Sequence, residues 1–453
     1  MTVTTSVAHR APVADGSFLL GSAQQLRRDV LGAAEQAFRQ YGDVVEFRAG
    51  PPGMRVKMYM LFHPDAAHRV LAGAAGNYRK DNIFYGEVRG AFGDGLLTSQ
   101  DDDWLRQKRF LQPLFTHRRI SGYAEAMGEE VADLLANWHS RRPHAVDLHE
   151  EMTRLTMRIV GRILFGDDVS RALLAVRQSF EPLGEAVRRR SFSPVRLPRS
   201  WPTPVNRRLV TAQKALYGVC DEIIARRRAA SDRGTDLLGL LLDARDQGHA
   251  LSDSEVRDQV LIFLLAGHET TSTALTFALH LLGQHPDLQR QIRAEADALG
   301  GMPTAADAPA LVQTTMALKE AMRLYPSAPM LGRRAVTDDE ICGYRIPAGS
   351  DVVLVPWVIH RHPQFWDEPT RFEPQRFTPE RDKGRHRYAW MPFGGGPRGC
   401  IGQHFSMLEA SIALASLVRE FEFETPSGEP RYTNHITLRP THAVTSRLTP
   451  RRH

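Results

Sequence analysis

The sequence predicts a mainly α-helical fold with a minor β-sheet region, formed by a single large domain. Between Trp104 and Arg323, apolar residues recur at spacings of three and four, as they do on one face of a helix. Short apolar or alternating segments on either side of this stretch are separated by glycine and proline, which is typical of strands and turns. The 453 residues contain no internal repeat and no low-complexity linker, so we expect one domain over residues 21–453 after a flexible segment 1–20.

The first part of the chain predicts a β-hairpin. The segments GDVVEFRAG (42–50) and RVKMYMLF (55–62) are rich in β-branched and aromatic residues and flank the turn sequence GPPG. Within the helical part, Ser191–Val205 contains four prolines, which helix interiors exclude, so we expect a long connection that forms part of a substrate lid. After Pro326 the pattern changes to strands and turns, and a last helix is expected directly after Cys400.

The composition is that of a globular protein with an ample core. Hydrophobic residues make up 42% of the chain and charged residues 24%, and the formal net charge of +6 is small for this length. No run of lysine and arginine indicates nucleic-acid binding, so we expect only a local basic docking surface. The three cysteines, Cys220, Cys342 and Cys400, are far apart and odd in number, which favours reduced thiols. The sequence shows neither the apolar core of a signal peptide nor a long apolar run, so we expect no membrane anchor and a cytoplasmic protein.

The segment MPFGGGPRGCIG (391–402) places Cys400 in a glycine-rich loop. Glycine lets a backbone approach a flat partner closely, and the helix expected after Cys400 would direct unpaired N–H groups at the sulfur and favour the thiolate. An isolated cysteine is more often a small buried hydrophobe. A zinc site lacks further ligands at suitable spacing, whereas a cysteine nucleophile would need a histidine base that the sequence does not exclude. The role that fits Cys400 best is that of a metal ligand, in a cofactor that itself supplies the metal's other ligands.

A second motif, LLAGHETTSTAL (264–275), interrupts an apolar helix with polar residues. The helix has a clear start, because Ser252 and Glu255 have the spacing of a capping box. Glycine and threonine inside the motif weaken the helix. Glu269 and Thr270 form an acid–alcohol pair that can deliver protons to a molecule bound beside the helix. The alternative, a polar face in solvent, is disfavoured because apolar residues flank the pair on both sides.

A third motif, KEAMRLYP (319–326), places Glu320 and Arg323 three residues apart on one helix face. Such pairs are common and contribute little when they lie on the surface. Arg376, in the downstream segment FEPQRF (372–377), is a candidate second cation for the same carboxylate. We expect a buried arginine–glutamate–arginine cluster that is structural rather than catalytic.

Together these four motifs resemble the cytochrome P450 family. FGGGPRGCIG is similar to the family's haem-binding loop, AGHETT to its oxygen-activation motif and EAMR to its Glu-x-x-Arg signature. FEPQRF is similar to its proline–arginine–phenylalanine segment, with Gln375 where glutamate is commoner. Each motif alone can arise by chance, but all four in this order are hard to explain otherwise. The resemblance covers most of the chain and implies the single-domain cytochrome P450 haem fold.

The resemblance implies a haem b that takes Cys400 as the axial thiolate of its iron, a ligation that favours O–O cleavage. Phe393 would pack against the proximal face of the haem. The residues implied for the haem propionates, which need hydrogen-bond donors and cations, are Trp104, Lys108, Arg333 and Arg398. Arg109 is an alternative to Lys108, because arginine or histidine is usual at that position in the family.

The implied reaction is a monooxygenation, in which O2 is reduced and one oxygen atom enters the substrate, most simply as a hydroxyl group. Thr270 would hydrogen-bond dioxygen or an ordered water, and Glu269 would relay protons from outside. Thr271 is expected to be structural, and His268 to point elsewhere. Oxidative coupling or cyclisation stays open as an alternative. Peroxide-driven oxidation and a non-catalytic haem sensor are disfavoured, because neither needs the acid–alcohol pair.

Electrons would come from NAD(P)H through an external reductase, because residues 401–453 leave no room for a fused redox domain. A separate ferredoxin or flavodoxin is implied, which would be acidic and would bind weakly to a monomeric protein. The cations expected near its docking face are Arg106, Lys108, Arg109, Arg118 and Arg119. Reversal of two of these charges should slow reduction and leave substrate binding intact.

The implied substrate is a lipophilic small molecule, such as a terpenoid, a fatty acid or another secondary metabolite, held in an apolar pocket. The residues that the resemblance places in this pocket are Leu97, Phe263, Ala266, Ala328 and Met330. Several of them would serve equally well as core residues. The form of the AGHETT motif leans toward the fatty-acid and terpene oxidising branches of the family, but the sequence does not identify the molecule.

Overall fold

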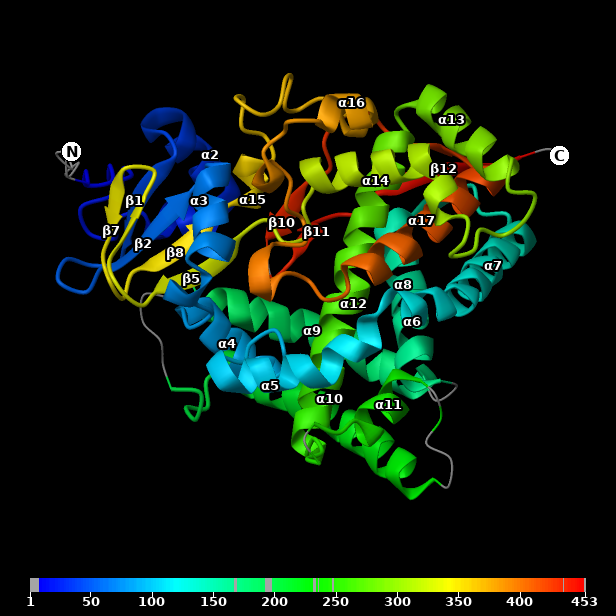
Figure 1. The fold of residues 1–453 in the computed structure, drawn as a ribbon, viewed down its shortest axis with the longest axis horizontal. Helices are drawn as coiled ribbons and strands as arrows, with labels where there is room; N and C mark the ends of the chain where they lie inside the picture. Colours follow the sequence, from blue (N-terminus) through cyan, green and yellow to red (C-terminus); the bar gives the residue numbers. More distant parts are fainter. Residues whose placement is uncertain are drawn as a thin grey trace, which may run out of the picture.

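Helices make up most of the computed structural model, which describes residues 8–166, 169–191, 198–230, 234, 236–246, 248–434 and 436–451 (Figure 1). The helices are α1 (Ala23–Arg28), α2 (Val30–Tyr41), α3 (Pro64–His68), α4 (Ile83–Phe92), α5 (Asp101–Leu111), α6 (His117–Gly122), α7 (Ala124–Arg141), α8 (Leu148–Phe165), α9 (Val169–Ser191), α10 (Pro204–Ala229), α11 (Leu237–Asp243), α12 (Asp253–Leu282), α13 (Pro286–Asp297), α14 (Val312–Leu324), α15 (Pro356–Ile359), α16 (Pro379–Asp382) and α17 (Gln403–Glu420). The expected mainly helical fold is therefore confirmed.

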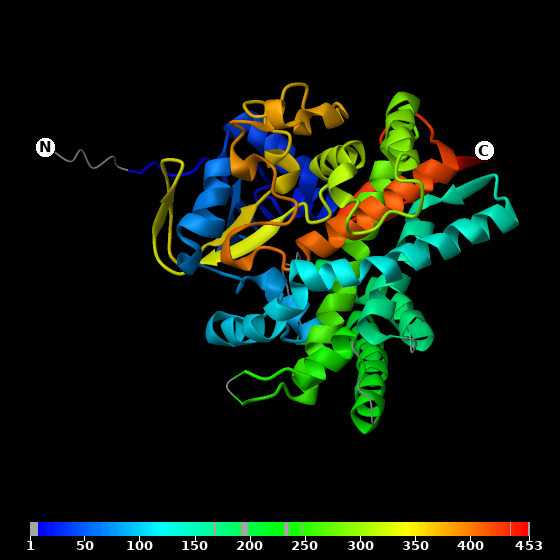
Figure 2. The same cartoon turned by 45° about the vertical axis from the view of Figure 1, so that its right-hand side comes forward.

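The strands form small sheets, of which the largest has five strands in the order β1-β2-β8-β5-β3. The strands are β1 (Val44–Ala49), β2 (Val56–Leu61), β3 (Tyr78–Arg79), β4 (Ala145–Asp147), β5 (Leu331–Ala335), β6 (Asp339–Ile341), β7 (Tyr344–Ile346), β8 (Asp351–Leu354), β9 (Phe421–Glu424), β10 (Tyr432–Asn434), β11 (Leu438–Pro440) and β12 (Thr445–Pro450). The expected hairpin is β1–β2, paired antiparallel from Val44↔Leu61 to Ala49↔Val56. The turned view shows this sheet, in blue and yellow, to one side of the helices (Figure 2).

The N-terminal segment joins the fold before residue 20. His9 N–H donates to the carbonyl of Gly343, and Glu46 N–H donates to the carbonyl of Pro12. Residues 1–7 lie outside the described residues. In the part that is described, the expected flexible segment is thus bound to β1 and to the β6–β7 hairpin.

The proline-rich connection expected at Ser191–Val205 falls partly outside the described residues, which omit 192–197. Helix α9 ends at Ser191 and α10 begins at Pro204, where proline occupies the first turn. The side-chain amide of Asn206 donates to the carbonyls of Pro198 and Trp201, at 2.9 and 2.8 Å. This amide fixes the described end of the connection against α10.

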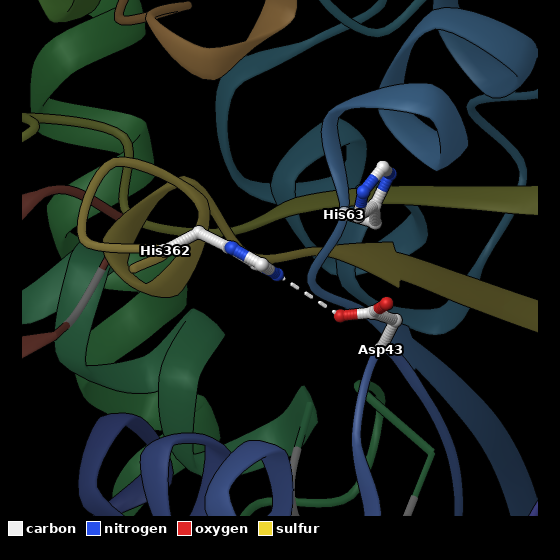
Figure 3. A group of neighbouring side chains, drawn as sticks. All are labelled: Asp43, His63 and His362. Atoms are coloured by element: carbon white, nitrogen blue, oxygen red, sulfur yellow. Dashed lines mark hydrogen bonds and ion pairs between the residues drawn. The ribbon is translucent and has the colours of Figure 1, made fainter. Parts of the chain in front are cut away.

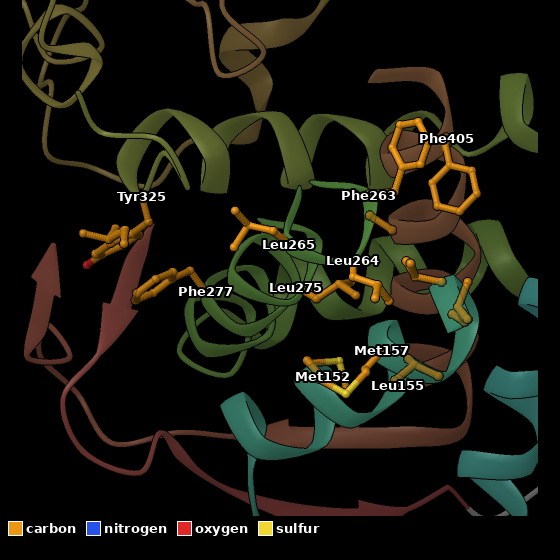
Figure 4. Packing of buried hydrophobic residues seen from close by; sticks show 14 of the residues in the cluster. Met152, Leu155, Met157, Phe263, Leu264, Leu265, Leu275, Phe277, Tyr325 and Phe405 are labelled. Atoms are coloured by element: carbon orange, nitrogen blue, oxygen red, sulfur yellow. The ribbon is translucent and has the colours of Figure 1, made fainter. Parts of the chain in front are cut away.

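Helix α12 is the central element of the fold. Its start is the expected capping box, in which Ser252 and Glu255 exchange side-chain and backbone hydrogen bonds. It packs on α8, α14, α10 and α17. Figure 4 shows Leu264, Leu265 and Leu275 of α12 in one cluster of buried apolar side chains with Met152 and Leu155 of α8. Residues 253–282 are long and apolar enough to cross a membrane, but 83% of the apolar window is buried inside the protein, as expected of a core helix.

Glu320 and Arg323 form the expected buried ion pair. Arg323 Nε and Nη2 donate to the two carboxylate oxygens of Glu320 at 2.7 and 2.8 Å, and both side chains are fully buried. Arg376 Nε lies 3.3 Å from the same carboxylate. Arg323 also donates to the backbone carbonyls of His360 and Pro369. The cluster therefore ties α14 to the segment that leads to the cysteine loop.

A second buried carboxyl has no such partner. Glu409, on α17, is fully buried, and neither of its oxygens makes a hydrogen bond of good geometry to a described residue. Burial raises the pKa of Glu409 well above its ordinary value, an effect that the nearby Thr271 hydroxyl partly offsets. Burial therefore favours the neutral form of Glu409 in the folded protein.

We predict that Glu320→Gln destabilises the fold by about 3–5 kcal/mol, because Arg323 and Arg376 would be left as buried cations without an anion. The matched control is Glu368→Gln, which breaks the exposed i,i+3 pair of Glu368 and Arg371. Glu368→Gln should lower the free energy of unfolding by less than about 1 kcal/mol. Chemical denaturation of both variants measures the difference, and equal losses would contradict a structural role of the cluster.

We predict that Glu409→Gln makes the protein more stable than wild type at neutral pH. The folded pKa of Glu409 is raised, so the folded state holds a proton that the unfolded state releases. Stability is then lost as pH rises above the unfolded value of about 4.3. The free energy of unfolding, measured from about pH 5 to about pH 8, should fall less steeply for Glu409→Gln than for wild type. Glu424→Gln, at an exposed position of β9, should leave the pH dependence unchanged.

Candidate functional site

An apolar cavity lies between α12 and the cysteine loop. Most predicted site residues line it, namely Cys400, Phe393, Arg398, Trp104, Lys108, Arg333, Thr270, Leu97, Phe263, Ala266 and Ala328. They come from the loop before α5, from α5, α12, the loop between α14 and β5, β5 itself and the segment before α17. Phe263 and Phe405, on α12 and α17, are seen at one end of the core in Figure 4. The fold thus brings together residues that are up to some three hundred positions apart in the sequence.

The cysteine loop is closed by its own backbone. Cys400 N–H donates to the carbonyl of Phe393 at 2.9 Å. Gly394 and Gly396 have φ values of +68° and +64°, which favour glycine. A Cβ atom on Gly396 would come within 1.7 Å of the Leu71 carbonyl oxygen. Glycine is needed here because the loop packs directly against another backbone segment.

The groups around the Cys400 thiol act on its pKa in opposite directions. Burial raises the pKa of the Cys400 thiol, and the Gly402 N–H and the Lys80 ammonium only partly offset this. Helix α17 begins at Gln403, and the N–H of its N-cap residue, Gly402, is directed at the sulfur. A further positive charge at the sulfur, such as a metal ion, would favour the thiolate.

Cations gather at one end of the cavity. Arg333 and Arg398 both line it, and the pKa of Arg398 is lowered to about 10 by burial and by the like charge of Arg333. Arg398 lies 4.5 Å from the centre of the Trp104 ring and donates to the Ser99 carbonyl at 2.5 Å. No aspartate or glutamate occurs among the described residues that line the cavity. Such uncompensated positive charge suits an anionic ligand.

The structure distinguishes between Lys108 and Arg109. Lys108 lines the cavity, with its Nζ 5.1 Å from the Trp104 ring centre and 3.2 Å from the Pro397 carbonyl oxygen. Arg109 instead forms an ion pair with Asp246 at 2.9 Å. Of the two, Lys108 is the one placed to bind a ligand in the cavity.

The hydroxyl-bearing and glycine residues in the polar stretch of α12 contact the cavity, the helix backbone and neighbouring helices. Thr270 lines the cavity, and its hydroxyl donates to the Ala266 carbonyl at 2.6 Å. Thr271 bonds to the Gly267 carbonyl and to the Ser406 hydroxyl, at 3.2 and 3.0 Å. A Cβ atom on Gly267 would meet Val160 of α8 at 3.0 Å, so this glycine allows the two helices to pack closely.

Two predicted residues do not face the cavity. Glu269 is buried and paired with Arg439 of β11, because it lies on a different side of α12 from Thr270. Met330 lines a neighbouring cavity with Asn434, whereas Leu331 and Arg333 face the main one. The reason is the alternation of side chains along β5, which sends successive residues to opposite faces. His268 is buried against the Leu264 carbonyl and points away from the cavity, as expected.

Lys80 is a site residue that the sequence analysis missed. It is buried in the cavity wall beside the cation pair. The segment around it carries no periodicity or motif that marks a ligand. Only the juxtaposition of residues 80, 333 and 398 in space reveals its role.

These groups fit a haem. The thiol of Cys400 can serve as a metal ligand, while the apolar walls suit a porphyrin and the cations suit its two carboxylates. Phe393 lines the cavity beside the loop glycines. The donor set therefore agrees with the cofactor that the resemblance implies.

A cluster of possible metal ligands elsewhere consists of Asp43, His63 and His362 (Figure 3). His362 Nε2 lies 3.1 Å from Asp43 Oδ1. However, His63 Nδ1 and His362 Nδ1 each accept a backbone N–H, from Asp65 and Gln364. The neutral rings therefore carry their protons on Nε2. Ligation through Nε2 would break both backbone hydrogen bonds, so the contacts favour a hydrogen-bonded cluster over a metal site.

Comparison with known proteins agrees with this site. A family model described as Cytochrome P450 matches residues 12–445. The chain is 38% identical over 410 residues to a cyclooctatin synthase of Streptomyces melanosporofaciens, with 88% of each chain covered. It is 33% identical to a cyclooctat-9-en-7-ol 5-monooxygenase of the same species, covering 86% of this chain and 84% of the relative. It is also 33% identical to a pentalenene oxygenase of Streptomyces avermitilis, covering 93% and 92%.

The fold gives the same result. The crystal structure of the haem domain of cytochrome P450DA matches with a TM-score of 0.85 at 28% identity, covering 98% of this chain and 99% of that one. The expected single-domain architecture is confirmed by this match. Sequence and fold thus agree that the chain belongs to the cytochrome P450 family, a family of haem-dependent monooxygenases.

Proposed function

We propose that this cytochrome P450 hydroxylates a terpenoid of secondary metabolism, using haem b, O2 and electrons that originate from NAD(P)H. The observation that carries the proposal is that Cys400 and Thr270 face one apolar cavity from two different elements. The relatives whose names specify an oxygenase or monooxygenase of terpenoid compounds support this substrate class over a fatty acid. Leu97, Phe263 and Ala328 supply apolar walls suited to a hydrocarbon skeleton.

Haem bound in the cavity would supply the reduction of O2 and the transfer of one oxygen atom to the substrate. The chain's own contribution is binding and proton control. Cys400 would hold the metal, and Arg333, Arg398 and Lys108 would hold the carboxylates. The Thr270 hydroxyl, which donates to the Ala266 carbonyl and lines the cavity, would orient a water molecule and hold its proton there.

Glu269 precedes Thr270 on α12, does not line the cavity, and would supply protons to Thr270. It is held by Arg439, on β11, and therefore reaches the cavity only when that ion pair opens. The Glu269 carboxylate can exchange between Arg439, outside the cavity, and the Thr270 hydroxyl, which lines it. Such a carboxylate is suited to carry protons into the cavity. The ion pair with Arg439 therefore controls when Glu269 can transfer a proton to the cavity.

The electron donor is a separate ferredoxin or flavodoxin that docks weakly on a monomeric enzyme. Of the expected docking cations, Arg106 pairs with Glu255 and Arg109 with Asp246. Arg118 and Arg119 are exposed on α6, which packs beside the start of α17, just after the cysteine loop. These two arginines are the centre of the docking surface. The three cysteines are free, which agrees with a cytoplasmic location.

We predict that the reduced protein with carbon monoxide gives the red-shifted Soret band of thiolate-ligated haem. Cys400→Ala should abolish this band, because no other described cysteine lines the cavity. The matched control is Cys342→Ser, at an exposed turn, which should retain it. A wild-type band at the position typical of a histidine-ligated or thiol-ligated haem would overturn the function proposed here.

The same preparation tests the substrate class. Cyclooctat-9-en-7-ol and pentalenene are suitable probes, with lauric acid as the fatty-acid comparison. Binding of a terpenoid should displace water from the cavity and shift the haem spectrum, while lauric acid should give a weaker shift. The reverse order would contradict a terpenoid substrate.

We predict that reversal of Arg118 and Arg119 to glutamate slows reduction by an acidic ferredoxin by roughly tenfold at low salt. The reduction rate of the variant should also depend less on ionic strength. The matched control is reversal of Arg207 and Arg208, two exposed neighbours on α10. Stopped-flow reduction under carbon monoxide measures the rate. Equal slowing by both double variants would place docking elsewhere.

A further inference from the structure

Lys80 is a buried cation that forms no ion pair with any described residue. It is 7% exposed and lies in the cavity wall. Its Nζ donates to the Leu97 carbonyl at 3.2 Å and lies 5.2 Å from the centre of the Tyr85 ring. An ammonium group has three N–H donors, and the protein satisfies one of them here with a hydrogen bond. The remaining donors are available to a ligand in the cavity.

The charges near Lys80 are of the same sign. Burial, followed by the repulsion of Arg333 and Arg398, holds the pKa of Lys80 well below its ordinary value. Three cations so close together, with Lys80 and Arg333 buried and Arg398 partly buried, are unfavourable unless an anion joins them. The cavity has apolar walls elsewhere, so the anionic part of its ligand belongs at this end.

The same cations hold a loop that faces the substrate. Lys80 donates to the carbonyl of Leu97, and Arg398 donates to the carbonyl of Ser99, two residues further on. The Gln100 side chain accepts from the Lys80 backbone N–H and donates to the Lys80 carbonyl. Residues 97–100 are therefore anchored to Lys80 through both its side chain and its backbone.

We propose that Lys80 binds a carboxylate of the haem while holding the Leu97 carbonyl, and so couples haem retention to the order of the substrate-facing loop 94–100. The inference rests on the proposed function, because it takes the haem as the ligand of the cavity. Lys80 acts here as a cofactor-binding and positioning residue. A neutral side chain of similar length would lose both contacts together.

The experiment compares haem-loaded wild type with haem-loaded Lys80→Met and Lys80→Arg. Transfer of haem to apomyoglobin, followed in the Soret region, should be roughly 10- to 100-fold faster for Lys80→Met, as expected for loss of a charge-assisted hydrogen bond. Amides of residues 94–100 should exchange hydrogen faster in the same variant. The haem reduction potential should become more negative, because a nearby positive charge is lost. Lys80→Arg should restore all three quantities toward wild type.

The outcomes separate coupling from a purely structural role. Faster exchange in the loop with unchanged haem transfer and potential would overturn the proposal, as would unchanged values throughout. If Lys80→Met takes up no haem, uptake by Lys80→Arg supports the proposal, and failure of both variants overturns it. Lys57→Met, at an exposed position of β2, is the matched control and should change nothing. Failure of the proposed function would appear separately, as a wild-type protein without the thiolate band.

Discussion

The structure depends on one constraint, which is that α12 is buried along most of its length and has to be covered by other elements. Helices α8, α14 and α17 supply that cover, and the aromatic stack of Phe277 on Tyr325, with ring centres 4.2 Å apart, closes one end. Around Ala266 and Gly267 the helix has little side-chain volume. Val160 of α8 packs closely against Gly267, and both residues line the cavity together with Ala266, so the site is part of the core packing.

Buried charge is handled in two different ways along the same chain. Around Glu320 the cations meet a carboxylate and backbone carbonyls, so the cluster is closed and structural. Around Arg333 the cations meet one another and lack a carboxylate. Both clusters contain buried arginines, but only the second is incomplete. A buried cation cluster that lacks a carboxylate indicates a site for an anionic ligand, whereas one that contains a carboxylate indicates a structural role.

The sequence was sufficient for the features that depend on local pattern or on a motif. The helical class, the β1–β2 hairpin and the capping box of α12 follow from residue spacing alone. Features that depend on where neighbouring side chains point were harder to predict. Adjacent residues on a helix diverge by about 100°, so the acid–alcohol motif could not show that Glu269 faces Arg439 while Thr270 faces the cavity. Lys80 was missed for a similar reason, because its partners lie more than two hundred residues away in the chain.

The thiol and the cations depend on the same ligand. Burial opposes ionisation of Cys400 and also opposes the charge of Lys80. In the function proposed here, a haem would favour both charged forms, because its iron would compensate the thiolate and its carboxylates would compensate the lysine and arginines. The chain therefore carries polar groups whose stability depends on haem, which is how an apolar core can include a charged and chemically specific site.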